Sequence, residues 1–322
     1  MSAILRTTLF TASLIYASAT FTADGYPTKP VRYVVPSAPG GNADALARIL
    51  AERLTKSFGQ QVLVENRPGG SNIVATELVV KAPPDGHTLL QIANAHFTNP
   101  TIFRQLPYDT TRDLAPVSLL ASTPLVMVAH PSVPARNVKD LIALARARPG
   151  ELNYHSSGVG TSGHLAGALL ASLAHINLVP VPYRGTAQAM TDVVSGDLHC
   201  AFPSLTVGLP FVKVGKLRAL GVTGSKRTPL APQLATISES GLPGYEASIW
   251  NGLLVPARTP REMIGRLNSE IIRVLTAPEI RQQLANTGSD AASSSPEEFG
   301  AFVDAEIRRW APIIKAAGIT PQ

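Results

Sequence analysis

The feature that most constrains this chain is a repeated unit in which a strand-like segment leads through a glycine-rich turn into a helix-like segment. "VRYVV" leads through "PSAPGG" into "NADALAR", and much later "NYHSS" leads through "GVGTSG" into "HLAGALL". Glycine has no Cβ, so such a turn leaves backbone N–H groups open at the positive end of the following helix, where an anion is stabilised. The repeat predicts two anion-binding turns that face one shared anionic ligand.

Strand-like and helix-like segments alternate along the rest of the chain. Hydrophobic periodicity and turn residues predict strands within residues 31–36, 61–66, 87–93, 124–131, 151–157, 178–183, 197–202, 217–222 and 248–256. They predict helices within residues 44–59, 72–82, 137–150, 164–174 and 185–196, with Asn137 as an N-cap, and three helices in the last third of the chain, including residues 297–318. This order predicts an α/β fold with largely parallel sheets, and 322 residues are enough for two domains.

The first 23 residues predict a cleaved secretory signal. They contain Arg6, a modestly apolar run over residues 9–16 and a small-residue pattern over residues 17–19, with no acidic residue before Asp24. The apolar run is too short to anchor the chain in a bilayer, and no later segment reaches ~20 apolar residues. We therefore expect a soluble mature protein outside the cytoplasm.

Charge and cysteine content narrow the classes of partner and chemistry. The formal net charge of +6 attracts anions in general. The chain has neither a dense basic run nor interleaved aromatic residues, so nucleic acid is not an expected partner. Cys200 is the only cysteine, which excludes an intrachain disulfide, and its alternation with Leu198 and Phe202 predicts a buried strand position rather than a nucleophile.

The second glycine-rich turn admits a different interpretation. Gly158, Gly160 and Gly163 have the G-x-G-x-x-G spacing of dinucleotide-binding turns, which are followed about 20 residues later by an acidic residue that holds the ribose. The corresponding region here is "PVPYRG", which has no carboxylate, although Arg184 would suit a 2′-phosphate. An NADP-linked or other extracytoplasmic enzyme that uses this loop remains the alternative function.

Other catalytic constellations are weaker. Ser156, Ser157 or Ser162 with His164 as a base would suit a hydrolase, but the G-x-S-x-G elbow is missing. The seven histidines show neither H-x-x-x-H spacing nor cysteine partners, so no metal site is expected. We predict no catalytic residue and no cofactor.

Seven segments taken together resemble one known family. The chain is similar, in order and spacing over nearly all of the mature sequence, to the Bug family of substrate-binding proteins of tripartite tricarboxylate transporters. The segments are "PSAPGGNADALAR", "VENRPGGSNIVATELVVKAPPDGHTLL", "LPYDTTRDLAPVSLL", "SSGVGTSGHLAG", "VPYRGTAQAMTDVVSGD", "IWNGLLVPARTP" and the C-terminal helix.

The resemblance implies a periplasmic receptor of the type II binding-protein fold. Two α/β lobes, joined by two crossing strands, would close over a small carboxylate and deliver it to membrane transporter subunits or a signalling partner. Mapped onto this chain, the first lobe comprises residues 24–122 and 224–322 and the second comprises residues 123–223, with crossings near "STPLVM" and "ALGVTG". The protein is expected to be monomeric.

The resemblance also implies a set of binding residues. In the first lobe it implies the amides of Ala38, Gly40 and Gly41 together with Asp44, and in the second lobe Ser157, Gly158, Thr161 and His164. We further hypothesise that Asn94, Phe97, Asn99, Thr186 and Ser204 discriminate among ligand bodies.

Three positions, Asp44, Ser37 and Ser204, carry further expectations. A carboxylate in the first turn of a helix competes with an anionic ligand for the same dipole, so Asp44 is expected to orient the loop or to act through water. Ser37 and Ser204 depart from residues common in the family, and both are expected to border the specificity pocket.

Overall fold

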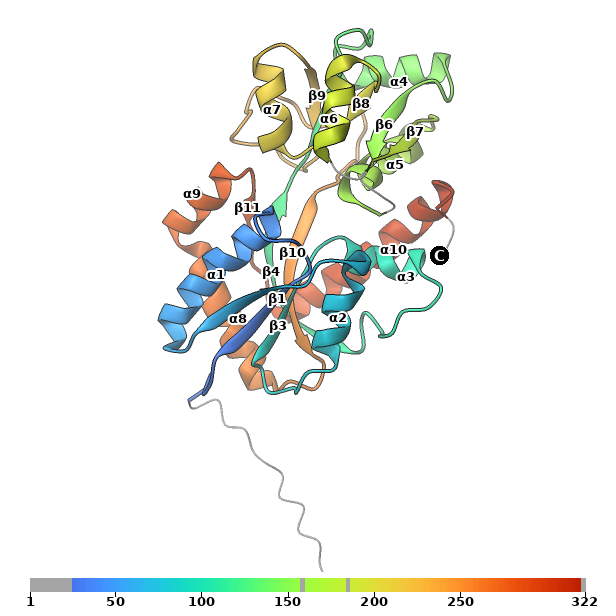
Figure 1. Cartoon of the computed structure of the whole chain (residues 1–322). Helices are drawn as coiled ribbons and strands as arrows, with labels where there is room; N and C mark the ends of the chain where they lie inside the picture. The colour runs from blue at the N-terminus through green and yellow to red at the C-terminus, as the bar shows by residue number, and fades with distance from the viewer. Residues whose placement is uncertain (1–24, 157–159, 184–185, 320–322) are drawn as a thin grey trace, which may run out of the picture.

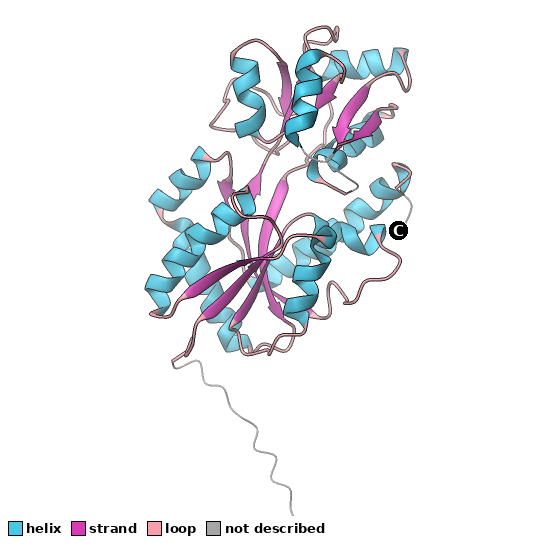
Figure 2. Cartoon of the chain, in the orientation of Figure 1, coloured by secondary structure: helices cyan, strands magenta, loops and turns pink. Residues whose placement is uncertain are grey.

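The computed structural model describes residues 25–156, 160–183 and 186–319, which fold into two α/β lobes (Figures 1 and 2). The first lobe contains a six-stranded sheet in the order β11-β4-β10-β3-β1-β2, and the second contains a five-stranded sheet in the order β7-β6-β8-β5-β9. The expected two-lobe architecture is therefore confirmed.

The first sheet is built on three strands that run parallel to one another. They are β1 (Val31–Val35), β2 (Val62–Asn66) and β3 (Thr88–Ile92). β10 (Ile249–Pro256) runs antiparallel to β3 and to β4 (Leu114–Thr123), and β11 (Asp290–Ala291) completes the edge. The parallel strands bring the loops that follow them to one edge of the sheet.

Alternate residues of these strands are buried on opposite faces, which explains their almost continuous apolar sequence. On one face Tyr33 and Leu253 pack beneath α1 (Asn42–Phe58) and α8 (Arg261–Thr276). On the other face Val34 and Leu254 pack beneath α2 (Ile73–Val80) and α10 (Pro296–Ala316). Two shorter helices, α3 (Ala95–Ile102) and α9 (Pro278–Asn286), complete the first lobe, and a 3-10 turn, η1 (Gly70–Asn72), precedes α2.

The second sheet follows the same scheme. β6 (Asn153–Ser156), β7 (Val179–Pro182) and β8 (Cys200–Ala201) are parallel, whereas β5 (Val126–Ala129) runs antiparallel to β8 and to β9 (Arg218–Val222). Its helices are α4 (Val138–Ala147), α5 (Ser162–Ala174), α6 (Thr186–Ser195) and α7 (Leu205–Lys213). Asn137 caps α4 as predicted, since its side chain accepts a hydrogen bond from the Asp140 amide.

Both sheets are mixed, so the expectation of largely parallel sheets is corrected. Each sheet contains a strand through which the chain passes directly between the lobes, namely β10 in the first and β5 in the second. A strand that arrives from the other lobe needs no crossover helix. It can therefore pair antiparallel with its neighbours.

The chain crosses between the lobes at two places. The first crossing joins β4 to β5 within "STPLVM". The second lies further along than expected, because "ALGVTG" contains β9, and the segment after it stays on the second sheet. Ile237 donates its amide to Val222, and Ala247 donates to Thr223. We propose that the lobe boundary lies near residue 248, where β10 begins, rather than at residue 223.

One local prediction, a buried Cys200, is confirmed by the fold. Cys200 is fully buried in β8, and burial raises the pKa of its thiol to about 12, as expected for a structural rather than a nucleophilic cysteine.

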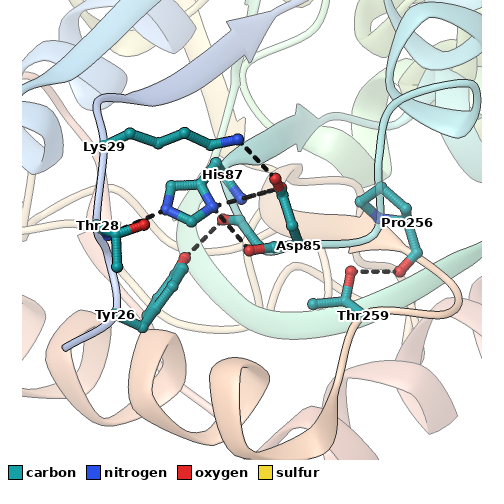
Figure 3. A network of polar contacts seen from close by, with 8 residues as sticks. Tyr26, Thr28, Lys29, Asp85, His87, Pro256 and Thr259 are labelled. Atoms are coloured by element: carbon teal, nitrogen blue, oxygen red, sulfur yellow. Dashed lines mark hydrogen bonds and ion pairs between the residues drawn. The ribbon is translucent and has the colours of Figure 1, made fainter. Parts of the chain in front are cut away.

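At the amino-terminal edge of the first sheet, Tyr26 donates to the Gly86 carbonyl, and Lys29 forms an ion pair with Asp85 (Figure 3). The predicted signal, residues 1–23, lies outside the described residues. No helix within residues 25–319, apart from the undescribed gaps, has the length and apolar character needed to cross a membrane.

Candidate ligand-binding site

The described residues that were expected to bind a ligand lie at or just after the carboxyl edges of the two sheets. Loops 36–41 and 93–94 follow β1 and β3 in the first lobe, and the loops that lead into α5, α6 and α7 follow β6, β7 and β8 in the second. Parallel strands of an open α/β sheet place ligands at this edge. Figure 1 shows that α1 and α5 begin on the sides of the two lobes that face each other.

The first glycine-rich loop is exposed and leads directly into α1. Gly40 has a φ of 86°, a conformation that favours glycine, and Gly41 is the N-cap with a φ of −79° and a ψ of 168°. Ala38, Gly40 and Gly41 are all exposed. The structure therefore places the three predicted residues together at a helix N-terminus that solvent can reach.

Asp44 holds this loop in shape. Its Oδ2 accepts hydrogen bonds from the Gly40 amide and from Arg48 Nε, both at 2.9 Å, and its Oδ1 accepts one from Asn66 Nδ2 at 2.9 Å. Asn66 Nδ2 also donates to the carbonyl of Ser37. The Asp44 side chain is only 4% exposed.

The ionised form of Asp44 is favoured by these contacts. The Arg48 guanidinium is the main reason why the pKa of Asp44 falls from 3.8 to about 2, with help from the Gly40 amide and Asn66 and in opposition to burial. The amide of Gly40 is thus engaged within the loop. This geometry matches the loop-orienting role expected for Asp44.

The second glycine-rich loop precedes α5. Gly160 has a φ of 75°, and Thr161 is the N-cap of α5 with a φ of −69° and a ψ of 155°. Ser157 and Gly158, the other two predicted residues of this loop, lie outside the described residues.

His164 is buried in the first turn of α5, where its carbonyl accepts a hydrogen bond from the Tyr154 hydroxyl. It also lines a pocket of about 540 Å³ between α5 and the end of α10, together with Ala168, Ala316 and Ala317. This pocket is formed with the C-terminal helix rather than with the first glycine-rich loop. A direct contact between His164 and the ligand stays a prediction.

The predicted residues after β3 are buried and engaged with the protein. Asn94 is 4% exposed, and its side chain bonds the backbone of Ser248 and Trp250. Phe97 is 2% exposed and packs in a hydrophobic cluster. Asn99 is 1% exposed and donates to the carbonyl of Ser71. In this structure the three residues support the site from within the fold.

Thr186 and Ser204 lie on the second lobe at starts of helices. Thr186 is the first residue of α6 and is half-buried. Ser204 is the N-cap of α7, and it pairs through an isolated β-bridge with Leu125 at the first crossing. Both are therefore at the same sheet edge as the second glycine-rich loop.

The two lobes touch at the second glycine-rich loop. A Cβ added to Gly160 would lie 2.6 Å from Cδ1 of Ile102 and 3.5 Å from Oγ1 of Thr98, both on α3 of the first lobe. Residues of α3 and α10 also share one hydrophobic cluster with the core of the second lobe. Among its members are Phe97, Ile102, Trp310, Ile314, Met127, Leu141 and Leu165.

One loop at the same edge was not predicted as part of the site. After β2, Gly69 and Gly70 are followed by Ser71 and Asn72, and all four have positive φ values between 50° and 115°. Asn99 fixes this turn through its bond to Ser71. The segment "GGSN" was the sequence signal for this turn, because glycine and asparagine tolerate the left-handed region best.

Charged groups near the first-lobe loops are paired. Arg48 pairs with Asp44, while Arg32 and Arg67 both pair with Glu65. The described part of the chain contains no cluster of three or more His, Cys, Asp or Glu side chains placed to hold a metal ion. The first glycine-rich loop is an exposed helix N-terminus at this edge, and a helix N-terminus suits an anion such as a carboxylate.

Comparison with known proteins identifies the family. The model of the tripartite tricarboxylate transporter family receptor matches residues 46–319. The UPF0065 protein in the tcbD-tcbE intergenic region of Pseudomonas sp. (strain P51) is 40% identical over 292 residues, which cover 90% of this chain and 87% of that protein.

Two solved structures share the fold over almost the whole chain. One is R. palustris Rpa4515 with adipate, which is 36% identical with a TM-score of 0.80 and covers 92% of this chain and 100% of that chain. The other is the periplasmic binding protein BugD, which is 31% identical with a TM-score of 0.76 and the same coverage. Proteins of this kind are solute-binding receptors and not enzymes, so the enzyme alternative for the glycine loop is abandoned. The chain belongs to the tripartite tricarboxylate transporter receptor family, the Bug-type periplasmic solute-binding proteins.

Proposed function

We propose that this protein is secreted to the periplasm, where it captures a small organic dicarboxylate between its lobes as a monomer and delivers it to membrane subunits of a tripartite tricarboxylate-type transporter. The observation that carries the proposal is the pair of glycine-rich helix starts, one on each lobe, at sheet edges that face each other. Adipate in the similar R. palustris protein supports the choice of a dicarboxylate.

The proposed ligand contacts are divided between the lobes. Ala38 and Gly41 are exposed beside α1, while Thr161 is the N-cap of α5, so one carboxylate held by the amides of both loops would bridge the two helix N-termini. Ser157 and Gly158 are proposed to supply further contacts from the second glycine-rich loop. Thr186 and Ser204, at neighbouring helix starts, are proposed to contact the body of the ligand.

Binding by the carboxylate alone would be insufficient. Four hydrogen bonds to a charged group contribute on the order of 1.5 to 3 kcal/mol each. Association costs ~4 to 15 kcal/mol, which offsets most of this gain. Lobe closure must therefore add apolar contact and exclude water to reach roughly −8 kcal/mol, the micromolar range.

The first experiment is a thermal-shift screen with mono-, di- and tricarboxylates, including adipate and aromatic acids, followed by calorimetry. A ligand that binds the folded protein raises the midpoint of unfolding by mass action, so at least one dicarboxylate is expected to do so. A protein whose melting is unchanged by every acid in the panel would contradict the proposal.

Gly41 offers a matched pair of variants. Gly41→Pro removes the amide proton, and the φ of −79° suits proline, whereas Gly41→Ala keeps the proton and places a Cβ no closer than 3.8 Å to the Ala38 carbonyl oxygen. Losing one charge-assisted hydrogen bond predicts roughly a 10-fold or larger loss of affinity in the proline variant. Equal affinities of the two variants for the dicarboxylate would show that the Gly41 amide does not bind it.

A further inference from the structure

The side chain of Asn94 hydrogen-bonds the backbone around the start of β10, just beyond the end of the main-chain pairing between β3 and β10. The last main-chain pair of this antiparallel ladder is Gly252 with Ile92. Two residues beyond it, Asn94 Oδ1 accepts a hydrogen bond from the Trp250 amide at 2.8 Å, and Asn94 Nδ2 donates to the Ser248 carbonyl at 3.0 Å. The side-chain amide of Asn94 thus supplies the donor and the acceptor that the backbone of another strand residue would have supplied.

The residues that Asn94 bonds lie at the second crossing between the lobes. Ala247 is still attached to the second sheet through Thr223, while β10 begins at Ile249 on the first sheet. Asn94 therefore contacts the chain on either side of the point where it changes lobe. Because Asn94 and Ser248 are 4% and 3% exposed, water does not compete easily for these bonds.

Gln91, on β3, connects β10 to α1, the helix that follows the first glycine-rich loop. Its Nε2 donates to Asn251 Oδ1 at 3.1 Å and to the carbonyl of Ala43, in the first turn of α1, at 2.9 Å. Its Oε1 accepts a hydrogen bond from the Tyr33 hydroxyl at 3.0 Å. One buried amide thus touches both the helix that follows the loop and the crossing strand.

We infer that Asn94 and Gln91 form a hinge bracket, in which Asn94 is a positioning residue that acts on the crossing strand and not a residue that contacts the ligand. The bracket fixes the direction in which β10 leaves the first sheet, and through Ala43 it couples that direction to α1. This inference rests on the proposed function for its effect on affinity. Its effect on the crossing strand does not depend on any ligand.

Asn94→Ala is the direct test, and Asn268→Ala is the matched control. Asn268 is also a buried amide with two hydrogen bonds to backbone carbonyls, those of Val117 and Ser294, but its contacts lie within the first lobe. In the ligand-free protein, hydrogen exchange at the Trp250 amide is expected to be at least 10-fold faster in Asn94→Ala than in Asn268→Ala. Equal rates would overturn the inference.

The lobe arrangement is measured by electron spin resonance between labels introduced by Leu63→Cys and Leu173→Cys. These positions are 49% and 39% exposed on different lobes, and buried Cys200 leaves the added thiols as the labelling sites. A broader distance distribution is expected for Asn94→Ala, with Asn268→Ala unchanged from the parent protein. Unchanged distributions in both variants would also overturn the inference.

Affinity for adipate separates positioning from contact. A hinge role predicts that Asn94→Ala weakens adipate and shorter or longer dicarboxylates by a similar factor, whereas a ligand contact predicts a changed ratio between them. A changed ratio with normal exchange at Trp250 would reject the bracket. If the parent protein binds no carboxylate, the proposed function fails, while the exchange and distance measurements still decide on the bracket.

Discussion

Gly160 and Ile102 lie so close together across the two lobes that a Cβ on residue 160 would come within 2.6 Å of Ile102 Cδ1. Gly160 also has a φ of 75°, which side chains rarely adopt. Ile102 is 4% exposed within the shared hydrophobic cluster, so it has little room to move away. The absence of a side chain at residue 160 is therefore what lets the second glycine-rich loop rest on α3.

Gly160→Ala is expected to destabilise the protein and to hold the lobes apart. The left-handed conformation costs an alanine roughly 1 kcal/mol, and the clash adds a cost of about the same size. Gly215→Ala is the control, because Gly215 has a similar φ of 72° but no atom within 4 Å of its added Cβ. The free energy of unfolding, measured in urea, and the affinity for a dicarboxylate should both fall further in Gly160→Ala than in Gly215→Ala.

A second substitution tests the cause of that effect. Ile102→Val removes Cδ1, so a double variant with Gly160→Ala should recover the part of the loss that comes from the clash. A double-mutant cycle without measurable coupling would show that the two residues do not meet in solution.

Two glycines inside helices are predicted to respond to alanine in opposite directions. In α5, a Cβ on Gly167 would lie 2.1 Å from Tyr154 Cε2, and Tyr154 is 1% exposed. In α8, a Cβ on Gly265 would meet nothing within 4 Å. Gly265→Ala should stabilise by about 0.5 to 1 kcal/mol through helix propensity. Gly167→Ala should destabilise by roughly 1 to 3 kcal/mol through overpacking.

Chemical denaturation of the two glycine variants decides between packing and propensity. If both proteins gained stability, α5 would not pack on Tyr154 as described.

Asp44→Asn is predicted to have an effect that depends on pH. The folded pKa of Asp44, about 2, lies below its unfolded value, so the carboxylate stabilises the protein above about pH 4 and this contribution is lost as pH falls toward 2. The shift corresponds to about 2 kcal/mol, which the variant should lack at neutral pH. The difference in unfolding free energy between the parent protein and Asp44→Asn should shrink as the solution is acidified.

The comparison between these two proteins cancels the other acidic groups whose pKa values are lowered, such as Asp85 and Asp109. A difference that stayed constant from neutral to acidic pH would mean that the Asp44 charge does not stabilise the loop.

Cys200 is predicted to be inert in the folded protein. Burial raises the pKa of its thiol to about 12, and the thiolate is the species that reacts with alkylating agents. Mass spectrometry after iodoacetamide treatment should find modification in denaturant and almost none under native conditions. Rapid native modification would place β8 at an exposed position and contradict the fold of the second lobe.

The local sequence was enough to predict many of the strands and helices. In the run from Val31 to Val35 every residue except Arg32 is buried, because helices cover both sides of its sheet, and the helix after it is capped by Gly59 in the left-handed conformation. The glycines around residues 40 and 160 marked the two loops, since only they allow those turns close to a helix start. These features depend on neighbours in the chain, so they were predictable.

The sequence did not predict the short helices α3 and α7. Each contains an internal proline, Pro100 and Pro210, which argues against a helix when sequence alone is read. Tertiary packing stabilises them instead, for example through Phe97 and Leu205, which are almost fully buried. Helix propensity is a weak signal wherever burial supplies more free energy.

The sequence alone was therefore enough to predict most of the strands and helices and the position of two glycine-rich turns that precede helices. The tertiary structure instead set the pairing of β9 within the second sheet and the bond from the Ala247 amide to the Thr223 carbonyl, because such pairing depends on residues far apart in sequence. It also decided that Asn94 bonds the crossing strand. An amide can serve a ligand or a backbone equally well, and its partner is set by which strand lies beside it.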